Sequence, residues 1–382
     1  MENSLKNLEK SFEKDSILSR AETLREQSLY PQSLKLFKQA LRRLLEMKDF
    51  EGIYHCLIAS GDLYRMTGDF DLAAENYADA IAVARESGSR AEVADAKVGL
   101  GLSLRAQGKW KEAIKFISES RKVYKKNNDV HGIAFTLWAE GGALRIKGDI
   151  MGAIETFRES HRIFKSMGDV HGVGYCICGL GGASRMAGRF KDSLRHYKAA
   201  NSLFTSLRDR FGKAYSFCGI GNAYRMLGDY KNALAYFAKA TRIYTKIGDK
   251  VSYAYTLWGL GTAYKMMGDY KKAGDYFSKA LRFFKKTKDP RGVIYCNLGF
   301  GEIALLEGKK AAAKRYCAAA LQGSKKHEFA LEKCHAETLF AFVDGPCSSD
   351  SLKKRLPGKK DITCYDRLGL KLRFQALPLN IP

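Results

Sequence analysis

The sequence predicts an all-α fold, a solenoid of antiparallel helix pairs. Two observations carry this prediction. The chain repeats itself every forty residues without a gap, and each repeat holds two stretches of helical periodicity that are separated by glycine. The repeat is clearest in two glycine columns, which fall at Gly61, Gly101, Gly141, Gly181, Gly221, Gly261 and Gly301, and at Gly68, Gly108, Gly148, Gly188, Gly228, Gly268 and Gly308. A fixed period of this length is typical of repeat arrays.

The unit Gly248–Thr287 illustrates how each repeat divides into two helices. Gly248-Asp249 and Gly268-Asp269 pair a residue that suits a helix end with one that suits an N-cap. We therefore expect a first helix over residues 251–267 and a second over residues 270–286. In the second helix Ala273, Phe277 and Ala280 share one face, which would pack on Gly261 of the first.

These residues carry a family resemblance. The pattern Leu260-Gly261, Tyr264, Gly268-Asp269-Tyr270, Ala273, Phe277, Ala280 resembles the tetratricopeptide repeat, and the resemblance extends over residues 15–343. It implies a right-handed superhelical solenoid of about eight repeats, in which the first helix of each unit lines the concave groove. The forty-residue unit is similar to the repeats of Pins-type adaptors, although their C-terminal motifs are absent after residue 345. We expect residues 1–343 to form the array with its N- and C-terminal capping helices, and residues 344–382 to form a basic linker and C-terminal tail.

Composition and charge limit the classes of function. The sequence has a formal net charge of +24, and only +5 of it lies after residue 345, so the folded body carries most of the excess. Such a field favours acidic protein segments or nucleic acid as partners. Because the chain lacks a membrane-spanning apolar run and a signal-peptide core, its nine cysteines are expected to be reduced thiols in the cytoplasm.

The first helices present a column of cations, one in each of six consecutive repeats. Helical spacing places this column on the stripe opposite the packing glycines, toward the groove. Arg is suited to binding carboxylates or phosphates with two hydrogen bonds, so the column predicts a site for an extended anion. The alternative is an internal ion pair with a neighbouring repeat, or a solvated stripe. The members of this cation column are Arg65, Arg105, Arg145, Arg185, Arg225 and Lys265.

An aromatic column lies beside the cations and predicts anchor points for a partner, with packing between repeats as the equal alternative. Its members are Phe135, Tyr175, Tyr215 and Tyr255, with Trp138 and Trp258 beside them. Asn222 is the amide of this stripe and would suit a hydrogen bond to the main chain of an extended peptide.

No catalytic, metal or cofactor site is predicted. The sequence lacks a Ser/His/Asp or paired-carboxylate arrangement with forced geometry, so we do not expect an enzyme. Cys334, His335, Cys347 and Cys364 do not have paired zinc-ligand spacing. The last stretch alternates Leu368, Leu370, Leu372 and Phe374 with small or polar residues, a strand-like pattern that could dock on a partner, fold back on the array or stay disordered.

The favoured function is a non-catalytic scaffold or adaptor that binds an extended acidic or amphipathic segment of another protein in its concave groove. The alternative is a helical-repeat protein that binds RNA or single-stranded nucleic acid, with phosphates on the cations and bases on the aromatic rings. A sensor that responds to a small ligand is a third reading. Self-association through the ends of the array is also open.

Overall fold

The computed structural model describes residues 16–344 and 363–382, and its helices pack as consecutive antiparallel pairs. After a first helix over residues 16–26, the helices are α2 Tyr30–Met47, α3 Phe50–Thr67, α4 Phe70–Glu86, α5 Arg90–Ala106, α6 Trp110–Lys126, α7 Val130–Lys147, α8 Ile150–Ser166, α9 Val170–Met186, α10 Phe190–Ser206, α11 Arg210–Met226, α12 Tyr230–Ile247, α13 Lys250–Met266, α14 Tyr270–Lys286, α15 Pro290–Leu306, α16 Lys310–Lys326, α17 Ala330–Asp344 and α19 Cys364–Arg367. The predicted all-α array of helix pairs is confirmed.

The repeat's own residues make these helices begin and end where they do. Asp129, Asp169 and Asp209 each accept a hydrogen bond from the amide three residues later, which caps the helix that follows. Gly148 ends α7 with φ +96°, a left-handed conformation that a side chain would strain. The packing glycines admit an aromatic ring from the partner helix, since a Cβ at Gly261 would lie 2.7 Å from the ring of Phe277.

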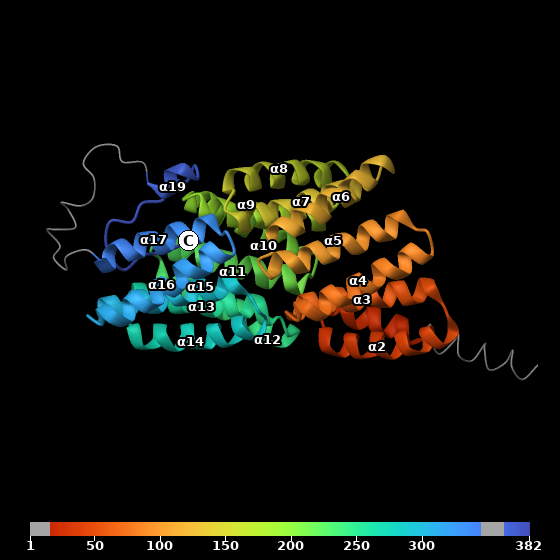
Figure 1. Ribbon diagram of the computed structural model, residues 1–382, viewed down its shortest axis with the longest axis horizontal. Helices are drawn as coiled ribbons and strands as arrows, with labels where there is room; N and C mark the ends of the chain where they lie inside the picture. The colour runs from red at the N-terminus through yellow and green to blue at the C-terminus, as the bar shows by residue number, and fades with distance from the viewer. Residues whose placement is uncertain (1–15, 345–362) are drawn as a thin grey trace, which may run out of the picture.

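The array winds tightly enough that successive turns of the superhelix touch (Figure 1). Lys250 Nζ lies 3.0 Å from Asp69 Oδ2, and Trp110 Nε1 donates to the carbonyl oxygen of His327 at 3.2 Å. These partners are 181 and 217 residues apart, about five repeats along the chain. The concave groove is therefore enclosed as a central cavity.

Residues 363–382, which we call the return segment, fold back on the array. α19 is followed by non-helical chain, and Leu370 and Leu372 are buried in a cluster with residues of α8 and α9. Leu379 and Ile381 are buried farther along, among residues of α12–α17. The sequence left three alternatives for this stretch, namely docking on a partner, folding back on the array, or disorder. The structure shows that it folds back on the array. The alternating residues form no strand within the described part of the chain, because no neighbouring strand is there to pair with them.

No helix in residues 16–344 and 363–382 is both long and apolar enough to cross a bilayer.

Candidate ligand-binding cavity

The first helices of seven consecutive repeats, from α3 to α15, line the central cavity. Its larger compartment, which we call the open pocket, has a volume of about 400 Å³ and is lined by the first three cations of the column, by Phe135, Trp138, Tyr175 and Tyr215, and by Asp249. A second compartment of about 240 Å³ adjoins it and shares Arg105, Arg145 and Tyr215. The second compartment extends past Arg185 and Asn222 to Trp258 and Pro382, where the return segment begins to fill the interior.

Arg105, Arg145 and Lys265 each reach toward the residue 37 positions later, in the next repeat. The Nη1 atom of Arg105 occupies the space that a Cβ at Gly142 would need, since the two would be 2.2 Å apart. In the same manner, the Nη1 atom of Arg145 would lie 2.4 Å from a Cβ at Gly182. At the other end of the column this position is Glu302, which forms an ion pair with Lys265. The residue at this position of the next repeat therefore determines whether the cation lies over a glycine or pairs with a carboxylate.

Three cations in the middle of the column lack an acidic partner. Among the described residues, no carboxylate pairs with Arg105, Arg145 or Arg185, and buried nitrogens of Arg145 and Arg185 have no hydrogen-bond partner. Burial, together with the neighbouring Arg145 and Arg65, lowers the pKa of Arg105 to about 10. An unpaired buried charge is costly, so this compartment is electrostatically suited to an anion.

Both ends of the column form ion pairs, but only Lys265 has the partner in a neighbouring repeat that the sequence left as an alternative. Arg65 lies 3.1 Å from Asp62 of its own helix, and Lys265 pairs with Glu302 of the next repeat. Arg225 has neither kind of partner and is instead fully buried under the return segment.

Arg225 binds the return segment through its guanidinium group. Its Nη2 atom donates to the carbonyl oxygen of Ile381 at 3.0 Å, and Nη1 donates to Asn380 Oδ1. Asn380 returns a hydrogen bond from Nδ2 to the carbonyl oxygen of Arg225 at 2.8 Å. Asn222 Oδ1 accepts from Arg225 Nη2 at 3.2 Å, and the guanidinium carbon lies 5.3 Å from the ring centre of Trp258. Asn222 thus holds the arginine that contacts the segment.

Lys265 and Glu302 bind both main-chain groups of Leu379. Lys265 Nζ donates to the carbonyl oxygen of Leu379 at 2.7 Å, and the amide of Leu379 donates to Glu302 Oε1. Burial lowers the pKa of Lys265 and raises that of Glu302, and their mutual attraction opposes both shifts. We call this end of the cavity, with residues 379–381 in it, the filled end.

The aromatic column divides between the cavity and the packing of the repeats. Phe135 stacks on Trp138 at 5.6 Å between ring centres, Arg105 lies 5.7 Å over Trp138, and Tyr215 stacks on Phe211 in the wall of the open pocket. The remaining rings line the cavity and also make packing contacts within the array. Tyr175 donates to Asp209 Oδ2 of the next repeat at 2.8 Å, Tyr255 packs on Phe284 of its own repeat, and Trp258 Nε1 donates to the carbonyl oxygen of Tyr295 in the next repeat at 3.3 Å.

Sequence reasoning missed Glu302 and residues 379–381. Glu302 directly follows the glycine column, in the position of Gly142 and Gly182, so an alignment of this column would have shown its charge. Nothing in the repeat pattern could indicate which part of the return segment enters the cavity, because that segment lies outside the repeats.

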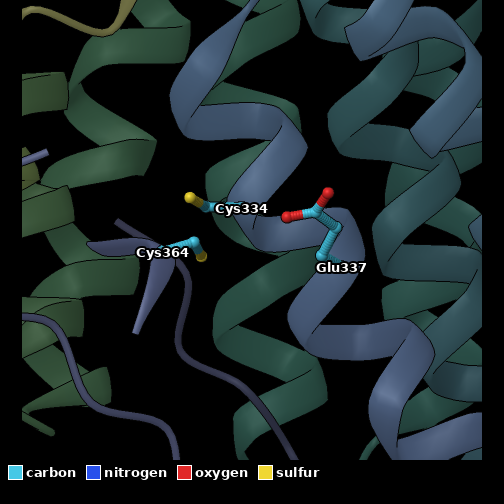
Figure 2. Close-up of side chains that lie close together, drawn as sticks. All are labelled: Cys334, Glu337 and Cys364. Carbon is cyan, nitrogen blue, oxygen red and sulfur yellow. The ribbon is translucent and has the colours of Figure 1, made fainter. Parts of the chain in front are cut away.

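A separate cluster forms where the return segment begins (Figure 2). Donor atoms of Cys334, Glu337 and Cys364 lie within 4.8 Å of one another. Cys334 and Glu337 lie on α17, and Cys364 is the first residue of α19. His335 faces elsewhere, with Nδ1 2.9 Å from the hydroxyl of Tyr365. Cys347, which the sequence analysis considered with them, lies outside the described residues.

Comparisons with known proteins agree with the fold. Tetratricopeptide-repeat family models match residues 58–123 and residues 174–246 and 211–286. No curated protein matches the sequence. Among solved structures, the Rap conjugation gene regulator of plasmid pLS20 in complex with the Phr* peptide is similar at TM-score 0.63 and 14% identity, over 88% of this chain and 99% of that one. A Rap protein complexed with Competence and Sporulation Factor is similar at TM-score 0.59 and 14% identity, over 87% and 97%.

The apo form of RapI is similar at TM-score 0.53 and 15% identity, over 72% of this chain and 98% of that one. These neighbours do not support the expected similarity to Pins-type adaptors. At such identities they establish the fold, which is the fold that the family models and the helix pairs also indicate. The chain therefore has the fold of a tetratricopeptide-repeat solenoid, and residues 58–123 and 174–286 match models of that repeat family.

Proposed function

We propose that this chain is a non-catalytic adaptor that binds an extended, acidic or amphipathic segment of another protein in its central cavity. One observation carries the proposal. Arg225, Lys265 and Glu302 bind the main chain of residues 379–381, so the interior already holds a non-helical segment. Main-chain hydrogen bonds are available from any extended peptide, and they supply affinity without requiring a particular side chain.

The unpaired arginines support an acidic ligand. Arg105, Arg145 and Arg185 can each take a carboxylate with two hydrogen bonds, which would offset the cost of their burial. Trp138, Phe135 and Tyr215 offer apolar surface beside Arg105 and Arg145 in the open pocket, and Arg185 lies in the adjoining compartment. At about 400 Å³ the open pocket is within the usual size range of ligand sites, and about 240 Å³ more adjoins it. A segment that alternates acidic and apolar side chains fits this lining.

Two of the similar solved structures are complexes with a peptide or a factor, which supports peptide binding by a solenoid of this shape. The nucleic-acid alternative is less well supported. A protein that tracks a nucleic-acid strand needs its cations along an accessible groove. Here the cations line the interior of the superhelix, and contacts between its successive turns shorten the groove that a strand could follow.

The test is a co-purification from the native host at moderate salt, with and without nuclease. The variant Arg145→Glu/Arg185→Glu reverses two charges in the cavity, and Lys191→Glu/Lys231→Glu reverses two exposed charges as the matched control. We expect a protein that is lost with the cavity variant, kept with the control and indifferent to nuclease. Its binding segment, made as a synthetic peptide, should change the fluorescence of Trp138.

Loss of the bound material on nuclease treatment would assign the chain to the nucleic-acid class. Equal recovery of the partner with the cavity variant and the control would contradict the proposal, because the cavity would then not be the binding site.

A further inference from the structure

We propose that the return segment is an intramolecular occupant of the ligand site, and that a bound protein segment displaces residues 379–381 to reach Arg225 and Lys265. This inference rests on the proposed function, because it names what regulates access to the same site. The segment and a ligand would compete for the same hydrogen-bonding groups of the filled end.

The contacts of residues 379–381 can be replaced by another chain. Leu379 contributes its amide and carbonyl groups, and Ile381 contributes its carbonyl oxygen. Asn380 is the one of the three whose side chain hydrogen-bonds, exchanging hydrogen bonds with Arg225, while the side chains of Leu379 and Ile381 are buried among apolar residues and could be replaced by other apolar side chains. A ligand with a carboxylate would bind Arg225 more strongly than the neutral groups of the segment do, since a charge-assisted hydrogen bond is about twice as strong as a neutral one.

The return segment is held by two anchors, and the inner anchor can detach from the array while the outer anchor stays bound. The outer anchor buries Tyr365, Leu370 and Leu372 against α17, α8 and α9. The inner anchor is residues 379–381, and between the two lie exposed residues such as Gln375 and Ala376. With the outer anchor in place, the inner residues stay at a high effective concentration, on the order of millimolar for a short tether. A ligand must compete with this effective concentration, so the segment raises the ligand concentration that is needed for binding.

The experiment measures binding of a labelled synthetic peptide, RFQALPLNIP, to the full chain by fluorescence anisotropy. The variant Leu379→Asp places a carboxylate beside Glu302 and should expel the inner anchor. Ala376→Asp adds the same charge at an exposed position and is the matched control. Asn380→Ala removes both side-chain hydrogen bonds to Arg225 and serves as the milder variant if Leu379→Asp unfolds the protein, as judged by circular dichroism.

We expect Leu379→Asp to bind the peptide at least tenfold more tightly than the wild type, and Ala376→Asp to bind like the wild type. Adding Arg225→Gln to Leu379→Asp should abolish the gain. Equal affinity for the wild type and the folded Leu379→Asp and Asn380→Ala variants would overturn the inference. The peptide is the chain's own sequence, so this result is separate from whether a partner protein is found.

A second inference comes from a different observation, the cluster of Cys334, Glu337 and Cys364 (Figure 2). We propose that these three side chains form a site for a thiophilic divalent cation such as Zn²⁺. Tetrahedral zinc with Zn–S bonds of about 2.3 Å places its ligand atoms about 3.7 Å apart, and the three donors already lie within 4.8 Å of one another. Lys333, whose Nζ atom lies 3.6 Å from Glu337, would give up that exposed ion pair. The ion would join α17 to the start of the return segment.

Cobalt(II) is the probe for this site, added to the full chain under reducing conditions. We expect one bound ion per chain with a thiolate-to-cobalt charge-transfer band, lost in Cys334→Ser and in Cys364→Ser and weakened in Glu337→Gln. Cys218→Ser, which changes a half-buried thiol of the cavity wall, should leave the band unchanged. The inference is wrong if the wild-type chain takes up no cobalt, or if both serine variants of the cluster keep the band.

Discussion

The two ends of the central cavity have the same repeat geometry but different electrostatics. Arg145 and Lys265 occupy the same position of their repeats, yet Arg145 extends over Gly182 while Lys265 pairs with Glu302 and binds Leu379. The repeat thus determines where a positive charge lies, and the next repeat decides whether that charge is neutralised. Under the proposed function the unpaired cations of the cavity are available to an external ligand, whereas the filled end has its own carboxylate and its own bound segment.

The free-energy cost of burying charged side chains is offset differently at the two ends of the cavity. Lys265 and Glu302 are almost fully buried, which is tolerable only because each neutralises the other. Arg105, Arg145 and Arg185 are half-buried and keep some contact with the solvent of the cavity. The arrangement implies that the filled end contributes to stability and that the open pocket contributes to binding. The predictions below test this division.

The largest expected effect is that of Glu302→Gln. The substitution keeps the shape of the side chain but leaves the buried ammonium group of Lys265 without a negative partner, which costs about 3–5 kcal/mol. Urea denaturation followed by circular dichroism would measure the loss. Arg145→Gln is the control from the open pocket and should stay within about 1 kcal/mol of the wild type, because no carboxylate pairs with Arg145 among the described residues. Equal losses in the two variants would show that the two ends do not differ as described.

Asp249→Asn should stabilise the protein in a pH-dependent manner. Asp249 lines the open pocket, and burial raises its pKa from 3.8 to about 6. As the pH rises from about 4 to 6, the unfolded chain ionises this group while the folded chain keeps it protonated, so the wild type loses stability. Because Asn does not titrate and caps a helix as well as Asp does, the variant's advantage should grow over this window to at most about 3 kcal/mol.

Thermal unfolding of both proteins at pH 4, 6 and 7.5 would measure this difference. The variant should also bind an acidic peptide more tightly, since a negative charge has left the pocket. An advantage that is the same at all three pH values would contradict the assigned titration.

The sequence was sufficient to predict the array of helix pairs, but not to predict the segment that occupies its cavity. The helices expected at 251–267 and 270–286 are found at Lys250–Met266 and Tyr270–Lys286, because caps and packing glycines act locally and recur in each unit. Contacts such as that between Lys250 and Asp69 depend on the sum of small rotations between many repeats, which no single unit encodes.

The contents of the cavity escaped prediction for a similar reason. The position of Ile381 over Arg225 depends on a segment without a period, whose path is set by where Leu370 and Leu372 find an apolar surface. Cys334 and Cys364 meet only because of that path, so their spacing in the sequence did not indicate a common site.

The smallest expected effect compares two adjacent glycines of α7. A Cβ at Gly141 would lie 2.9 Å from the buried ring of Phe157, which has little room to move, so Gly141→Ala should cost about 1–3 kcal/mol. A Cβ at Gly142 meets only the far end of the Arg105 side chain, which can turn into the cavity. Since Ala favours a helix over Gly by about 1 kcal/mol, Gly142→Ala should be neutral or stabilising in urea denaturation. It should nevertheless alter Trp138 fluorescence, because Arg105 lies over that ring. If Gly142→Ala destabilised as much as Gly141→Ala, Arg105 would be a packed structural residue and not a mobile cation of the open pocket.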